Sequence, residues 1–320
     1  MILLRQMIIL FILMLAGYGC RKYKVLSEGA FKPLALLVTQ IANPALIISA
    51  SLKSTIDISS VRLLKVVGFT FVIYLLLLVI SRLAAHFLPM KYQRKNMYLM
   101  MLLFSNIGFM GLPLVQVTYG QQELFYMTIF QMPYDLLIYT YGVYLLNSEE
   151  KIKNKVHEAT LCGRMKVLWR NLMNPGSAAA LAAMLIYVTA CRLPDVITQP
   201  LTMLGNLAAP LSMMVIGASF CDMKLRELVC DIRLLLFGVV KLLVLPFLLI
   251  VLLWLCKVPE EMLHVCLIIF ATPVGSMVAM FARQYETQQE LAEKAVVFTT
   301  VCSVITIPLL QIILEHILSH

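Results

Sequence analysis

The sequence predicts an all-α polytopic membrane protein with ten transmembrane helices, arranged as two inverted five-helix repeats. Three observations predict this class: the composition, the number of apolar runs, and a pair of interrupted runs in the two halves. The 320-residue chain is 61% hydrophobic and 13% charged, with a mean hydropathy of +0.89. Soluble domains carry about 25% charged residues, so the composition argues against an ordinary soluble fold.

A helix that crosses a bilayer needs about 20 mainly apolar residues. Ten runs of the sequence meet this rule, and no stretch between them is long enough to form a soluble domain. The predicted spans are 2–20, 31–52, 62–88, 97–119, 123–146, 174–191, 198–220, 232–256, 261–283 and 291–316.

The longest polar stretch, 147–173, is expected to connect a first repeat at 1–146 to a second repeat at 174–320. Lys and Arg concentrate in this connector and in the other loops on the same side. Because cytoplasmic loops are enriched in Lys and Arg, we expect the connector to be cytoplasmic. The protein is expected in the plasma membrane or inner membrane, with both termini on the outer side. The loops on the opposite side hold Lys53, Arg62, Lys65, Arg192 and Lys257. This pattern explains the net charge of +9 without a nucleic-acid partner.

Helix-breaking residues recur at similar offsets in the two halves. Pro113 in the fourth span and Pro273 in the ninth lie 160 positions apart. The other pairs are Pro44 with Pro210 and Pro133 with Pro308. A five-span unit is odd, so its second copy must enter the membrane from the opposite face. Such inverted repeats place a transporter's substrate site near the midplane, where broken helices meet.

Proline at the first turn of a helix is well tolerated, so Pro113 and Pro273 are expected to begin second half-helices. Two half-helix N-termini would then point at mid-membrane, each with free N–H groups and about +0.5 of a charge. This arrangement favours an anion. The alternative is a pair of structural kinks in tightly packed helices.

Two ionisable residues lie within predicted spans. Asp135 lies near the centre of the fifth span and Lys241 within the eighth. A charge at this depth costs at least about 2.5 kcal/mol on insertion scales, which makes each a functional candidate. Asp135 could take up a proton or a cation. Alternatively, as a neutral or paired residue, it could hold neighbouring helices together. Lys241 is its expected partner on charge grounds, and could instead counter a substrate carboxylate or snorkel to an interface.

Uncharged hydrogen-bonding residues lie at or near the breaks. Asn43, Ser105, Asn106 and Thr272 could coordinate substrate, or could cap a broken helix end. The eight cysteines show no metal-ligand spacing, and no cofactor or metal is expected. The sequence has no phosphate-loop motif, so ATP-driven transport would need a separate subunit. H-E-x-x-H and G-x-S-x-G motifs are also absent, which argues against a metalloprotease or a serine hydrolase, and no enzyme is expected.

Three motifs resemble the auxin efflux carrier family, which includes plant PIN-type auxin carriers and prokaryotic carriers of malate and other organic acids. They are Asn43-Pro44-Ala45-Leu46, Asn106-x-Gly108-Phe109-x-Gly111-Leu112-Pro113-Leu114, and Pro273-x-Gly275 followed by Phe281-Ala282-Arg283-Gln284-Tyr285. The chain departs from plant carriers at Met277-Val278, where they have a second Pro. Gly275-Ser276 stands where many prokaryotic members have Asn.

The resemblance implies that spans 4 and 9 cross at their breaks and that a transport domain carries the site past a scaffold, as an elevator. It carries the family's crossover Asn and Pro onto Asn106, Pro113 and Pro273. With the polar residues above, the candidate substrate site comprises Asn43, Ser105, Asn106, Gly108, Pro113, Thr272, Pro273, Gly275 and Ser276.

The leading functional hypothesis is a secondary transporter of small organic anions such as carboxylates or auxin-like acids, driven by the substrate gradient or by H⁺ or Na⁺. Asp135 and Lys241 are the candidates for ion coupling. One alternative is a sodium-coupled carrier of the bile-acid-symporter type. The other is a non-transporting receptor or scaffold subunit. The expected partners are the anion, membrane lipid and a second copy of the chain.

Overall fold

The computed structural model describes residues 2–27, 30–53, 60–87, 94–147, 175–189, 193–222 and 231–319. These residues are 89% helical and contain no β-strand, which confirms the all-α class. Except for its first residue, the predicted connector at 147–173 lies outside the described residues.

Helices lie within all ten ranges predicted as spans. In chain order they are α1 (Ile2–Lys22), α2 (Phe31–Leu37), η2 (Val38–Ala42), α3 (Asn43–Lys53), α4 (Ser60–Phe87), α5 (Lys95–Leu103), η4 (Ile107–Gly111), α6 (Leu112–Thr118), α7 (Gln121–Leu137), η5 (Ile138–Gly142), α8 (Val143–Asn147), α11 (Pro175–Thr189), α12 (Asp195–Asn206), α13 (Ala208–Ser219), η6 (Phe220–Asp222), α15 (Ile232–Val239), η7 (Val240–Val244), α16 (Leu245–Leu255), α17 (Glu260–Ala271), α18 (Ser276–Gln284) and α19 (Gln289–Leu318).

Six helical segments of the described chain are long and apolar enough to cross a membrane. They are Leu4–Lys22, Pro33–Leu52, Leu63–His86, Asp195–Ser219, Ile232–Leu255 and Gln289–Leu318. The fourth and ninth predicted spans are each divided into shorter helices. The count of ten spans therefore stays a prediction.

Proline shapes three of these segments in the same way. The π-helical turns η2, η4 and η7 each begin six residues before a proline, which is Pro44, Pro113 or Pro246 respectively. Proline has no N–H and its ring clashes with the carbonyl four residues earlier, so the regular helical pattern fails there. A π turn, with its i to i+5 hydrogen bonds, absorbs the mismatch and is often found at functional sites.

Helices from the two halves of the chain pack against each other reciprocally. The first helix of the first half, α1, contacts α13, and the first described helix of the second half, α11, contacts α3. At the α1–α13 contact, a Cβ atom on Gly17 would overlap the Met214 carbonyl, and one on Gly217 would overlap the Met14 carbonyl. Small residues of this kind let helix backbones approach closely in membranes.

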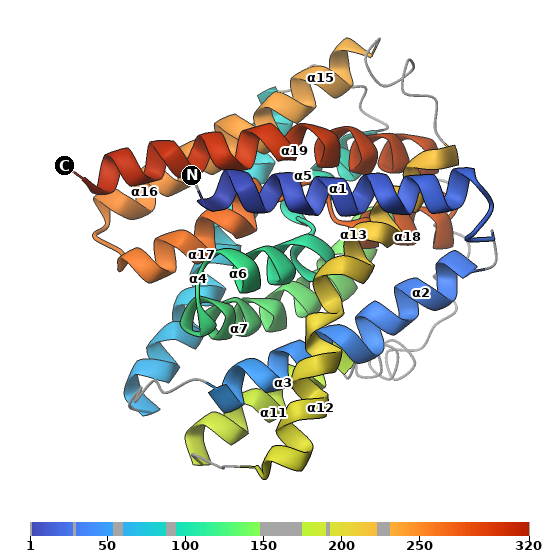
Figure 1. Cartoon of the computed structure of the whole chain (residues 1–320). Coiled ribbons are helices and arrows are strands. Elements are labelled where there is room, and N and C mark those ends of the chain that lie inside the picture. Colours follow the sequence, from blue (N-terminus) through green and yellow to red (C-terminus); the bar gives the residue numbers. More distant parts are fainter. Residues whose placement is uncertain are drawn as a thin grey trace, which may run out of the picture.

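The interrupted segments form the centre of the fold, and longer helices surround them (Figure 1). Met97 to Leu103 of α5 and Met262 to Ala271 of α17 are all buried apart from His264. In contrast, the outer helices expose large apolar side chains, including Ile12, Leu75 and Ile305. Apolar surface of this extent marks a membrane-facing protein. The N-terminus of α1 and the C-terminus of α19 lie at the same end of the molecule (Figure 1).

Candidate functional site: two helix breaks that meet

The first break separates α5 from η4. Helix α5 ends at Leu103, and Phe104, Ser105 and Asn106 follow in non-helical conformations. Asn106 has φ −82° and ψ 61°, and the Ile107 N–H donates to the Ser105 carbonyl at 2.9 Å. These values describe an inverse γ-turn centred on Asn106. The chain thus turns sharply before the helix resumes.

After the first break, the helix resumes earlier than Pro113 suggested. Helix resumes at Ile107 and runs through η4 into α6, so Pro113 lies six residues inside it. The expectation that Pro113 starts this half-helix was wrong. Its physical role is to impose the π turn that precedes it, because it cannot donate a hydrogen bond.

The second break separates α17 from α18. Helix α17 ends at Ala271, and Thr272 is extended at φ −64° and ψ 146°. The residue before a proline is disfavoured in the helical region, so Pro273 explains why the helix stops there. Helix α18 then begins at Ser276, three residues after Pro273. The expectation that Pro273 itself begins this half-helix was therefore wrong.

The two breaks lie side by side and are joined by backbone hydrogen bonds. Ser105 and Val274 form an isolated antiparallel β-bridge. The Asn106 N–H donates to the Pro273 carbonyl at 2.8 Å, and the Gly275 N–H donates to the Phe104 carbonyl at 2.9 Å. Backbone groups that a broken helix leaves free are thereby satisfied inside the protein, as membrane depth requires.

Close approach at this junction explains the glycine at position 275. A Cβ atom there would lie 3.0 Å from the Ser105 carbonyl oxygen, 3.1 Å from that of Phe104 and 3.1 Å from the Tyr134 hydroxyl. By contrast, a Cβ atom on Gly108 would meet only the Asn43 amide nitrogen, at 3.8 Å. Of these two predicted site glycines, only Gly275 is required by crowding.

The starts of the two resumed helices are in direct contact. Asn106 precedes η4, and its side-chain Nδ2 lies 3.4 Å from the Oγ of Ser276, the first residue of α18. The first N–H groups of a helix have no partner within it, and together they carry about half a positive charge. The structure therefore brings two partly positive helix ends together.

Asn43 connects a third element to this junction. It begins α3, and its Nδ2 donates to the Gly108 carbonyl at 2.9 Å. Its Oδ1 is buried and accepts no hydrogen bond from the described residues. Asn43 thus ties α3 to the start of the first resumed helix and keeps one acceptor available.

Two threonine hydroxyls make further hydrogen bonds at the second break. The predicted Thr272 is fully buried, and its hydroxyl donates to the Ile269 carbonyl at 3.2 Å, one turn back. The Val274 N–H donates to the Oγ1 of Thr299 on α19 at 3.1 Å. Sequence reasoning missed Thr299, although Thr299, Thr300 and Ser303 form a polar stripe in an apolar span and could have drawn attention to it.

Lys241 reaches the first break from η7. Its Nζ donates to the Ser105 Oγ at 2.6 Å and to the Leu102 carbonyl at 3.1 Å, and the side chain is fully buried. Neither acceptor is Asp135, so the expected Lys241–Asp135 pair is not present. The lysine lies instead at the C-terminal end of α5, where the helix dipole is negative.

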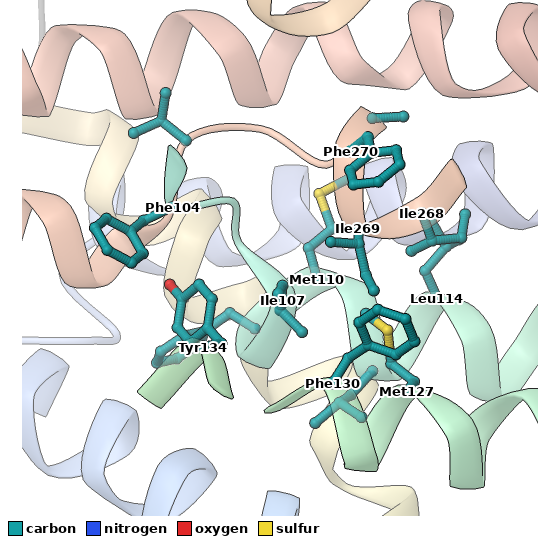
Figure 2. Close-up of a cluster of buried hydrophobic side chains, with 14 of the residues drawn as sticks. Phe104, Ile107, Met110, Leu114, Met127, Phe130, Tyr134, Ile268, Ile269 and Phe270 are labelled. Atoms are coloured by element: carbon teal, nitrogen blue, oxygen red, sulfur yellow. The ribbon is translucent and has the colours of Figure 1, made fainter. Parts of the chain in front are cut away.

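Asp135 lies beside the junction rather than in it. Its Oδ1 accepts a hydrogen bond from Gln131 Nε2 at 2.9 Å, and the carboxyl group is buried on α7. The preceding residue, Tyr134, packs edge-on against Phe104 with ring centroids 5.7 Å apart (Figure 2). Its hydroxyl is also the group that approaches Gly275. Tyr134 is a site residue that the sequence did not reveal, because its position resembles ordinary helix packing.

An apolar cluster surrounds the junction. Figure 2 shows Ile107 and Met110 of η4 close to Ile269 and Phe270 of α17 and to Phe130 of α7. All five side chains are 0–1% exposed. A dry surrounding strengthens the electrostatic effect of the helix ends and of Lys241, because the local dielectric constant is low.

An apolar bundle with two broken helices that meet through their backbones defines a membrane transport protein of the discontinuous-helix kind. The family model described as a membrane transport protein, that of the auxin efflux carriers, matches residues 2–311. The chain belongs to the auxin efflux carrier family. A comparison with curated proteins finds no match.

Proposed function

We propose that the protein is a secondary active or facilitative transporter of small organic anions such as carboxylates. The observation that carries the proposal is the contact between Asn106 and Ser276, which brings together the starts of two helices at the centre of the fold. Two helix N-termini side by side repel each other unless a negative group lies between them. A carboxylate there would accept hydrogen bonds from free N–H groups of both helices.

The proposed site uses the residues predicted from the sequence, with different roles. Asn106 and Ser276 supply side-chain hydrogen bonds, and Asn43 supplies a buried acceptor for a protonated or hydroxylated substrate group. Ser105, Gly108, Thr272, Pro273 and Gly275 shape the backbone around the site. Pro113 lies within the helix that follows the first break and favours the π turn η4 that precedes it. Tyr134 joins the set as a hydroxyl next to Gly275.

We further propose that the ten helical segments form two inverted repeats that work as an elevator, with both termini outside. The exchange of partners, α1 with α13 and α3 with α11, is what a two-fold axis between the halves would produce. The tight Gly17 and Gly217 contacts suit a fixed scaffold. The hydrogen-bonded breaks suit a unit that moves as one body. The placement of both chain ends at one end of the molecule supports the common side for the termini (Figure 1).

Purified protein in liposomes tests the transport proposal directly. A thermal-shift screen of mono- and dicarboxylates first identifies the anions that stabilise the protein, since a ligand of the native state raises the melting temperature. Uptake of the best anion, labelled, is then compared with protein-free liposomes. Saturable uptake supports a carrier. Stabilisation by an anion without any flux supports a receptor subunit and contradicts the proposal.

Asp135→Asn is expected to abolish the dependence of uptake on pH, while uptake itself persists. The amide keeps the hydrogen-bonding shape next to Gln131 but cannot ionise. Initial uptake rates across a pH series measure the effect. Gln122→Glu, which adds an ionisable group at another position of α7, serves as the control. An unchanged dependence in Asp135→Asn rules out coupling through this residue.

Pro273→Ala is expected to lower the uptake rate by about tenfold with a smaller loss of folded protein. Alanine permits Thr272 to become helical, so α17 can extend into the break and weaken the bond from the Asn106 N–H to the residue-273 carbonyl. Uptake per folded molecule, normalised by size-exclusion chromatography, is the measurement. Pro259→Ala, at the start of α17, is the control. Parallel losses of uptake and yield would mean that Pro273 only maintains the fold.

A further inference from the structure

Lys241 is a buried lysine whose hydrogen-bond acceptors are uncharged. The side chain is 0% exposed and lies within the apolar segment Ile232–Leu255. Its two acceptors are the Leu102 carbonyl and the Ser105 hydroxyl. An ionisable group at this depth is expensive and normally has a function. Its function follows from what it contacts.

The Leu102 carbonyl lacks its usual partner within the helix because the helix breaks. In a continuous helix it would accept from the Asn106 N–H, but that N–H donates to Pro273. The carbonyl therefore belongs to the negative end of α5, which carries about half an elementary charge. In transporters with discontinuous helices, such half-helix C-termini and unwound carbonyls coordinate the coupling Na⁺ or H⁺. The ligands of Lys241, a carbonyl and a hydroxyl oxygen, are also ligands for a hard cation.

We propose that Lys241 is a tethered cation that takes the place of a coupling ion at the broken end of α5, so that anion transport does not require Na⁺. The inference rests on the proposed transport function. Lys241 would act as a positioning residue: it holds Ser105 and the end of α5, and Asn106 follows Ser105 directly in the chain. The Lys241 side chain lies at one side of the first break, and the starts of η4 and α18 lie at the other. All three would be positive, so the site would have a fixed preference for an anion.

The first test measures thermal stability in detergent and does not depend on transport. Lys241→Ala leaves the two oxygen acceptors facing the space of the lost ammonium group. Its melting temperature is expected to rise saturably with NaCl, but not with choline chloride at the same ionic strength. Ser105→Ala in the Lys241→Ala background removes one oxygen ligand and should remove most of the rise. The wild type and Lys65→Ala, which removes an exposed lysine of α4, should show no rise specific to Na⁺.

The second test measures uptake in liposomes. Wild-type uptake is expected to be equal in NaCl and choline chloride. The uptake rate of Lys241→Ala in choline chloride should be at least about tenfold lower than that of the wild type, because two buried acceptors lose their donor. Its uptake rate should recover in NaCl. If Lys241→Ala does not fold, Lys241→Gln, whose amide can still donate to one acceptor, is used for both tests.

Two results would overturn the proposal: a Na⁺ requirement in the wild type, or a folded Lys241 variant without stabilisation specific to Na⁺. The two proposals fail differently. A wild type that transports no anion contradicts the transport function, whereas the melting-temperature series still reports on Lys241. A transporting wild type whose Lys241 variants ignore Na⁺ contradicts only the tethered cation.

Discussion

Asn106→Ala is expected to reduce anion uptake by about 10- to 100-fold with little change in melting temperature. The alanine keeps the backbone bonds of the break, since the Asn106 N–H and carbonyl still bind Pro273, Met110 and Gly111. What disappears is the side-chain amide that contacts Ser276. A hydrogen bond to a charged group contributes about 1.5–3 kcal/mol, which corresponds to that loss in affinity. Initial uptake rates over a substrate series in liposomes give the measurement.

Asn206→Ala provides the matched control. Asn206 is an exposed residue at the end of α12, and its side chain accepts a hydrogen bond from Gln116 at 3.1 Å. Its replacement removes the same amide group away from the junction, and uptake should be unchanged. Equal uptake by wild type and Asn106→Ala at low substrate concentration would remove Asn106 from the substrate site.

Gly275→Ala is expected to destabilise the protein by about 1–3 kcal/mol and to reduce uptake strongly. The new Cβ atom would lie 3.0 and 3.1 Å from two backbone oxygens of the first break, which are held by the β-bridge and cannot move independently. The two breaks must therefore separate, and the bond from the residue-275 N–H to Phe104 must lengthen. The melting temperature in detergent and the uptake rate both report the change.

Gly68→Ala is the control for the added methyl group. Gly68 lies inside α4, and a Cβ atom there would meet nothing within 4 Å. Alanine is a better helix former than glycine by about 1 kcal/mol, so this variant should be neutral or more stable. If Gly275→Ala behaved like Gly68→Ala in both stability and uptake, the close contact of the two breaks would have no functional role.

The sequence predicted the helical class and both breaks because Pro and Gly act locally. Proline forbids its own N–H bond and restricts the preceding residue, so the stop of α17 before Pro273 could be read from the residues alone. The same reasoning failed at Pro113, where a proline can be absorbed by a π turn and the chain breaks seven residues earlier. Which outcome occurs depends on tertiary bonds that one sequence does not display.

The partners of the buried polar groups could not be predicted. Charge alone suggested Asp135 for Lys241, yet the lysine binds the carbonyl and hydroxyl oxygens of the first break. A freed backbone carbonyl is invisible in a sequence, because every residue has one. Thr299 and Tyr134 were missed for a related reason: their importance comes from what lies opposite them, on segments far away in the chain.

The joint between the two breaks is made of main-chain atoms, through the bonds of Asn106 with Pro273 and of Gly275 with Phe104. Peptide groups are present whatever the side chain, so selection can exchange most of the neighbouring residues without dismantling the joint. A lineage built on this architecture can therefore diversify the metabolites it recognises while it inherits the same backbone framework.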